Sequence, residues 1–220
     1  MIEVALAMAV IAFGMTSILG LFPVGLNACR NAIAENSASD AAGQFSSYLK
    51  GYAESSKANF ENLFGTSDVT GYYTETNPMT IPATVITVKT KTADFLNAIT
   101  TGTPYAAVPV YRGWTIFPSD NASPPTLKNV YFTVFGPGNY FDAAGAAKFP
   151  NWDFAAMIVV WKTPLTYYVP RVNGSGWDTY QDSTYSLGAG LNIEVSWPLD
   201  VADYSARQKR TFYIEINKPQ

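Results

Sequence analysis

Few residue types in this sequence could do chemistry. Its 220 residues include no histidine and a single cysteine, Cys29. This excludes disulfides within the chain, histidine or thiolate metal clusters and nucleophiles that rely on a histidine base. Seventeen carboxylates remain, but there is no Gly-rich phosphate loop, no H-E-x-x-H and no nucleophile elbow. We therefore predict a protein that is not an enzyme and has neither cofactor nor metal, with a carboxylate-pair hydrolase as the catalytic alternative.

Two charged stretches are candidate binding sites. Residues 173–178 (NGSGWD) and Asp182 offer oxygens for Ca²⁺, but their spacing fits no calcium motif, so a solvated turn is the preferred interpretation. Residues 207–210 (RQKR) form the only basic cluster and could touch DNA. Asp200 and Asp203 lie in the same loop, however, and the net charge is −3, so we prefer a self-neutralising hairpin tip and expect no nucleic-acid partner.

Aromatic and asparagine residues suggest two further surface roles. Aromatic residues make up 15% of the chain and could form a sugar-stacking platform, but at strand spacing they are more often core or subunit interface. The five tryptophans are Trp114, Trp152, Trp161, Trp177 and Trp197. Asn121 and Asn173 each begin an N-x-S sequon, which is a weak glycosylation signal.

A long apolar stretch near the N-terminus is the strongest signal in the chain. Val4 to Leu26 is 23 residues without a charge, and at about 1.5 Å per residue it reaches about 34 Å, enough to cross a bilayer. It could be a signal peptide, a plain anchor, or a helix that leaves the membrane to pack in an assembly. A signal peptide is disfavoured because the stretch is too long and only the acidic Glu3 precedes it. The lipoprotein-like site that ends at Cys29 fits poorly because of Asn27.

Glu3 is the informative residue of this region. A carboxylate beside a long apolar helix costs up to a few kcal/mol in lipid unless a cation pairs with it. We therefore expect an external cation to meet Glu3.

These residues resemble the N-terminal methylation region (class III) of type IV pilins and type II secretion pseudopilins. Residues 1–8 (MIEVALAM) are similar to that segment with its first two residues missing. Glu3 then stands at the family glutamate, and Pro23 lies near the family's helix-kinking proline. The resemblance implies that Glu3 pairs with the N-terminal ammonium of a neighbouring subunit. The family's leader and N-terminal phenylalanine are missing, so we expect the natural precursor to begin upstream with a short basic leader. The resemblance is strong over residues 1–52 and only architectural beyond.

Specific roles along the helix follow from this resemblance and from the residue types. Residues expected at the subunit-assembly surface are Glu3, Val4, Phe13, Leu19 and Phe22. Residues expected to bend or melt the helix are Gly14, Gly20, Pro23 and Gly25. Cys29 is expected to be a small side chain buried between packed helices.

A second, amphipathic stretch continues the helix to about residue 52. Its apolar side chains recur at spacings of three, four or a multiple of four, which places them on one face. They are Leu26, Cys29, Ile33, Ala41, Phe45, Tyr48 and Tyr52. We expect Ile33, Phe45, Tyr48 and Tyr52 to pack on the head.

The rest of the chain predicts a β-rich head. We expect a short helix at 55–64, a strand at 84–91, and later strands at 130–135, 156–162, 165–169, 191–197 and 211–216. The last two should pair antiparallel across the loop 198–210, with one sheet face on the helix. The predicted fold is α+β and pilin-like, with a kinked N-terminal helix on an antiparallel sheet. Its parts are a membrane or filament-core helix (1–26), a stalk helix (27–64) and a head (65–220).

Together these patterns predict a structural subunit of a type IV pilus-like filament. Its partners are other copies of itself, and before assembly the inner membrane and the pilus assembly machinery. The predicted location is the bacterial inner membrane, then the cell surface. The alternatives are a minor pilin or secretion pseudopilin, and a membrane-anchored adhesin that binds carbohydrate.

Overall fold

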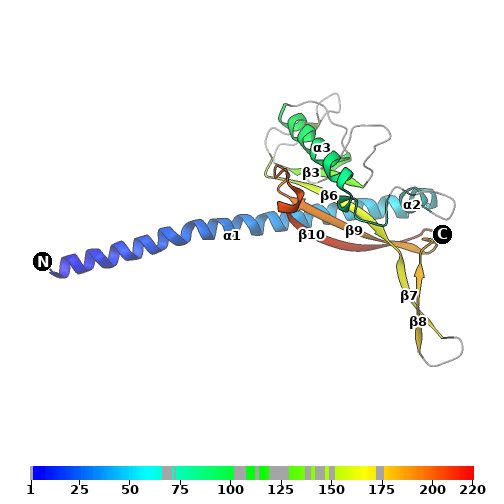
Figure 1. The fold of residues 1–220 in the computed structure, drawn as a ribbon, viewed down its shortest axis with the longest axis horizontal. Helices are drawn as coiled ribbons and strands as arrows, with labels where there is room; N and C mark the ends of the chain where they lie inside the picture. The colour runs from blue at the N-terminus through cyan, green and yellow to red at the C-terminus, as the bar shows by residue number, and fades with distance from the viewer. Residues whose placement is uncertain are drawn as a thin grey trace. The chain divides into compact units, whose positions relative to one another are not determined.

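Helix α1 (Ile2–Glu54) runs through both of the units into which the chain divides, residues 1–37 and 38–220. The first unit consists of the beginning of α1, and the second holds the rest of α1 and every other element (Figure 1). The computed structural model describes residues 2–65, 71, 73–101, 108–111, 114–118, 129–136, 140–141, 147–148, 152–171 and 176–220.

The second unit is an α+β structure. Its helical elements after α1 are α2 (Lys57–Phe64), the 3₁₀ turn η1 (Pro78–Thr80), α3 (Pro82–Thr101) and the 3₁₀ turn η2 (Tyr204–Ala206). Its strands are β1 (Val108–Tyr111), β2 (Trp114–Pro118), β3 (Val130–Phe135), β4 (Tyr140–Phe141), β5 (Ala147–Lys148), β6 (Phe154–Thr163), β7 (Leu165–Pro170), β8 (Trp177–Asp182), β9 (Gly188–Trp197) and β10 (Gln208–Asn217).

Six strands form one antiparallel sheet in the order β1-β2-β3-β6-β9-β10. The predicted strands at 130–135, 156–162, 165–169, 191–197 and 211–216 are confirmed as β3, β6, β7, β9 and β10. The predicted antiparallel pairing of the last two is also confirmed, with Phe212 opposite Ile193. Two short pairs, β4–β5 and β7–β8, stand apart from the main sheet.

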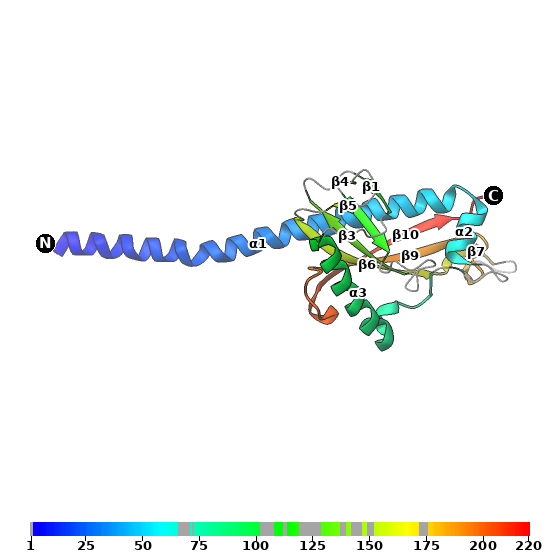
Figure 2. The same cartoon turned by 90° about the horizontal axis from the view of Figure 1, so that it is seen from above.

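Helices cover both faces of this sheet. Tyr131 and Phe132 are neighbours in β3 and therefore point to opposite faces. The Tyr131 ring lies 4.8 Å from that of Phe45 in α1, and the Phe132 ring lies 4.8 Å from that of Phe95 in α3. The end of α1 thus packs on one face and α3 on the other, as Figures 1 and 2 show. The sequence predicted only the first of these helices.

The stretch 84–91 was expected to be a strand and is instead part of α3. Its Thr, Val and Ile residues have high strand propensity, but tertiary packing outweighs propensity here. Val88, Thr92 and Phe95 recur at helical spacing and are buried. Pro82 begins the helix, where a missing amide hydrogen costs nothing.

The buried stripe of α1 differs by about one residue from the predicted face. Its members are Ala38, Ala41, Ala42, Phe45, Leu49 and Ala53. Phe45 is 1% exposed, but Tyr48 is 46% and Tyr52 39% exposed. The spacing of apolar residues predicted the tyrosines on this face, whereas in the structure small alanines let the helix lie close to the sheet. The tyrosines keep their hydroxyls near water instead. Ile33, also expected at this contact, belongs to the first unit and is exposed.

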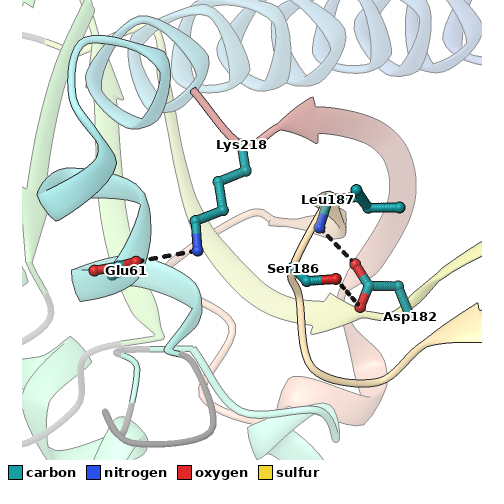
Figure 3. A network of polar contacts seen from close by, with 5 residues as sticks. All are labelled: Glu61, Asp182, Ser186, Leu187 and Lys218. Atoms are coloured by element: carbon teal, nitrogen blue, oxygen red, sulfur yellow. Dashed lines mark hydrogen bonds and ion pairs between the residues drawn. The ribbon is translucent and has the colours of Figure 1, made fainter. Parts of the chain in front are cut away.

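Polar contacts tie the end of the chain to α2 and close the turn after β8 (Figure 3). Lys218 Nζ lies 3.0 Å from Glu61 Oε1 in α2. Asp182 is buried and accepts hydrogen bonds from the Leu187 amide at 2.8 Å and from the Ser186 hydroxyl at 3.0 Å. These bonds hold the chain as it turns from β8 into β9.

Candidate functional site

The first unit presents an apolar helix with no covering side chains from its own residues. We call residues 4–26 the apolar segment. Its large apolar side chains are all exposed, and they are Val4, Leu6, Met8, Val10, Ile11, Phe13, Met15, Ile18, Leu19, Leu21, Phe22, Val24 and Leu26. A helix that is apolar on every side is normally buried in a large protein or in a membrane. The segment is long and apolar enough to cross a membrane by length and composition alone, a criterion that signal sequences also meet.

The predicted assembly residues lie around the whole circumference of the helix. Val4 and Phe22 are 18 residues, or five turns, apart and therefore lie on the same side. Phe13 is nine residues, or two and a half turns, from each and lies on the opposite side. Together with Leu19, all are well exposed. Only an environment that surrounds the helix could cover all of them.

The two hydroxyls in the apolar segment are satisfied within the helix. Thr16 donates to the Ala12 carbonyl at 2.7 Å, and Ser17 donates to the Phe13 carbonyl at 2.8 Å. Bonding to the carbonyl four residues back removes the need for water at these side chains. The surface is therefore suited to an apolar environment even at its polar positions.

Helix α1 is continuous through the four residues expected to bend or melt it. It does not melt at Pro23, although proline cannot donate a hydrogen bond to the Leu19 carbonyl four residues back. At Gly14, Gly20 and Gly25, no atom of the described residues other than the adjoining helix backbone lies within 4 Å of where a Cβ would be. Contacts within the chain therefore do not account for these glycines.

Glu3 lies in the first turn of α1, where the partial positive charge of a helix N-terminus favours a carboxylate. Among the described residues it has no ion-pair partner. Arg30, the next charged residue, is 27 positions away, or about 40 Å along a helix. The cation expected for Glu3 is thus absent from the described part of the chain.

Both described carboxylates of the candidate calcium loop have other partners. Asp178 lies 2.7 Å from Arg171. Burial alone raises the pKa of Asp182, but hydrogen bonds from the Leu187 and Ser186 amides and from the Thr184 and Ser186 hydroxyls hold that pKa below its ordinary value. The described residues contain no group of three or more His, Cys, Asp or Glu arranged to hold a metal. The sequon residues Asn121 and Asn173 lie outside the described residues.

The four tryptophans whose side chains the structure describes do not gather into one platform. Trp197 is buried next to Phe154, and Trp161 packs on the α3 face of the sheet. Trp177 lies on β8 and Trp152 just before β6, both exposed, while the Trp114 side chain is outside the described set.

The basic cluster at 207–210 is partly buried rather than wholly exposed at a tip, although acidic residues of the same loop do lie near its charges, Asp200 near Arg207 and Asp203 near Lys209. Arg207 is 6% exposed and donates to two backbone carbonyls rather than to Asp200 or Asp203. The cluster RQKR contains no apolar residue, so the sequence carried no signal for this burial. Cys29, expected to be buried between helices, is exposed in the isolated chain.

Comparisons with known proteins leave the family of the chain open. No protein-family model, no curated protein and no solved structure matches it.

Proposed function

We propose that this chain is a structural subunit of a type IV pilin-like helical filament, held together by the apolar segments of its subunits. The observation that supports this is the exposure of the apolar segment on every side of α1. Burial of apolar surface contributes about 25 cal/mol per Å². Several neighbouring copies can cover such a surface on all sides, whereas one partner covers one face.

In this proposal the segment first spans the inner membrane and then moves into the filament core. Glu3 pairs there with the N-terminal ammonium of a neighbouring subunit, which neutralises a charge that is costly in an apolar environment. Contacts between subunits are head-to-tail and do not close, so a fibre results. The sheet and α3 form the surface of the fibre, and the role of the protein is structural rather than catalytic.

Electron microscopy of native material tests this proposal. Wild type should form helical fibres, and Glu3→Ala should lower their yield at least about tenfold, which corresponds to about 1.4 kcal/mol. Asp40→Ala is the matched control, because Asp40 is an exposed carboxylate on the same helix in the second unit. Discrete particles in wild type would refute the filament. Equal fibre yields for all three proteins would refute the pairing of Glu3 with a neighbouring subunit.

The single native cysteine allows a second test without mutagenesis. Cys29 is exposed, so a spin label attached there reports on neighbouring copies. A filament gives strong dipolar coupling between labels, which disappears when labelled subunits are diluted with unlabelled ones. A plain membrane anchor, as in a tethered binding module, gives no coupling at any dilution. That outcome would favour the adhesin alternative.

A further inference from the structure

A cavity of about 300 Å³ lies in the second unit, between α3 and the loop that joins β9 to β10. Its apolar lining comes from Met79 in η1, Val85 and Val88 in α3, and Met157 in β6. Met79, Val88 and Met157 belong to the core on the α3 face of the sheet. The cavity therefore borders the core and has the size of a small ligand site, while Met157 and Val88 themselves remain almost fully buried.

A buried guanidinium forms part of its wall. Arg207 Nε donates to the Val201 carbonyl at 2.8 Å, and Nη2 donates to the Leu199 carbonyl at 3.1 Å. The third nitrogen, Nη1, has only the Met157 sulfur at 3.9 Å, and sulfur is a weak acceptor. Met157 and Arg207 both line the cavity, and Nη1 is the guanidinium nitrogen that lies next to the Met157 sulfur. The two carbonyl bonds hold the group in place and leave one donor nearly unused.

No carboxylate forms an ion pair with Arg207 among the described residues, although Asp200 lies near enough to favour its charged form. Burial lowers the pKa of Arg207, and the nearby Tyr204 and Asp200 only partly oppose this effect. A buried, charged donor without an anionic partner is costly. The cost would fall if an anion entered the cavity.

The remaining polar groups of the cavity leave it with a positive balance. Lys89 on α3 is exposed and has no ion pair among the described residues. Asp203 accepts hydrogen bonds from the amide and hydroxyl of Ser205, and the Tyr204 hydroxyl donates to Glu194. The lining thus contains two cations, Lys89 and Arg207, against the one carboxylate of Asp203.

We propose that this cavity binds a small organic monocarboxylate with an apolar body. The carboxylate accepts from Arg207 Nη1 and from Lys89, and the apolar body lies among Met79, Val85, Val88 and Met157. A monoanion fits better than a phosphate dianion, because the guanidinium has one nitrogen left to donate and the nearby Asp200 and Asp203 already offset part of the positive charge. This site does not depend on whether the chain forms filaments.

The methionines make the test specific to this site. The chain has five, of which Met79 and Met157 line the cavity, while Met1, Met8 and Met15 lie near the N-terminus. The full-length protein, labelled with ¹³C at the methionine methyl groups and kept in detergent micelles, is titrated with hexanoate and followed by NMR. The Met79 and Met157 methyl signals should shift and saturate. Met8 and Met15 report any partition of hexanoate into the micelle.

Matched ligands and variants separate the contributions of the ligand's carboxylate, of Lys89 and of the apolar cavity. Hexanol and hexylammonium should bind at least about tenfold more weakly, because they lack the anion that Arg207 needs. Lys89→Gln should weaken hexanoate binding about two- to fivefold, as expected for an exposed cation. Lys91→Gln, the same change on the same helix outside the cavity, should have no effect. Val85→Phe should fill the cavity and abolish the saturable shift.

Arg207→Gln should also abolish binding, but loss of its carbonyl bonds can unfold the loop. The Lys89 and Val85 variants keep the test decisive in that case. The proposal is overturned if hexanol shifts Met79 and Met157 as strongly as hexanoate does. It is equally overturned if no saturable shift occurs at millimolar hexanoate, or if Val85→Phe leaves binding unchanged.

Discussion

The two ends of α1 show what a helix surface reveals about its partner. Near the C-terminal end, residues 38–53 bury a narrow stripe of alanines with Phe45 and Leu49, and the other positions are mostly polar. In the apolar segment, large side chains point outward on every side. The first pattern matches one flat partner, which the chain supplies as its own sheet. The second requires partners on all sides, and the first unit supplies none.

The largest effect is expected when one phenylalanine in each part of α1 is replaced by alanine. Phe45→Ala should lower the free energy of unfolding of the head by about 3–5 kcal/mol, because it removes a buried ring that packs on Tyr131. Phe13→Ala should change it by less than about 0.5 kcal/mol. Tryptophan fluorescence during urea unfolding measures this, since all five tryptophans lie between residues 114 and 197. Equal effects of the two variants would contradict the contrast.

Small residues sharpen the same comparison. Ala41 is buried where α1 meets the sheet, so Ala41→Leu should force the helix away and cost about 1–3 kcal/mol. Ala9→Leu, in the apolar segment, adds the same atoms at an exposed position and should leave head stability unchanged. Urea midpoints of the two variants decide between these outcomes. A tolerated leucine at position 41 would mean that close approach is not what the alanines provide.

One carboxylate from each unit shows the same contrast between a group with partners in the chain and a group without them. Asp182 has several donors within the chain, and Glu3 has no ion-pair partner among the described residues. Asp182→Asn should therefore lower head stability by about 1–3 kcal/mol at neutral pH. Its pKa is held low in the folded state, so the ionised form stabilises the fold above the unfolded value of about 3.9. The difference from wild type should shrink as pH falls below about 4.

Urea unfolding at several pH values, from neutral to about pH 3, measures this difference. Glu3→Gln is the control and should leave head stability unchanged throughout. A gap between wild type and Asp182→Asn that stays constant down to the lowest pH would show that the hydrogen-bond geometry, and not the charge, matters.

Sequence reasoning found those elements whose pattern is local. The alternation Leu191, Ile193, Val195 predicted β9, and the uncharged stretch before Asn27 predicted the beginning of α1. It was wrong at 84–91, because β-branched residues favour strands locally while burial of Val88 and Phe95 against the sheet favours a helix. That burial depends on strands more than 30 residues away in sequence, which no local pattern contains.

Site residues divide along the same line. The exposed apolar segment could be recognised from composition, since exposure follows when nothing in the chain can cover it. The burial of Arg207 could not, because its role depends on the carbonyls of Leu199 and Val201 in a folded loop. The shift of the buried stripe from the tyrosines to Leu49 and Ala53 likewise depends on how closely the helix approaches the sheet.

Pro23→Ala should have the smallest effect on the head and a clear effect on the helix. Alanine restores the amide hydrogen that can bond to the Leu19 carbonyl. It also removes a helix-interior proline, which costs about 3 kcal/mol relative to alanine. Hydrogen exchange should therefore slow for peptides covering residues 19–27 and stay unchanged in the head. Pro82→Ala is the control, because Pro82 begins α3 and its missing amide costs nothing there. A change of more than about 1 kcal/mol in head unfolding would show that the apolar segment is energetically coupled to the head. The contrast between the two ends of α1 would then be wrong, because the apolar segment would also have a partner within the chain.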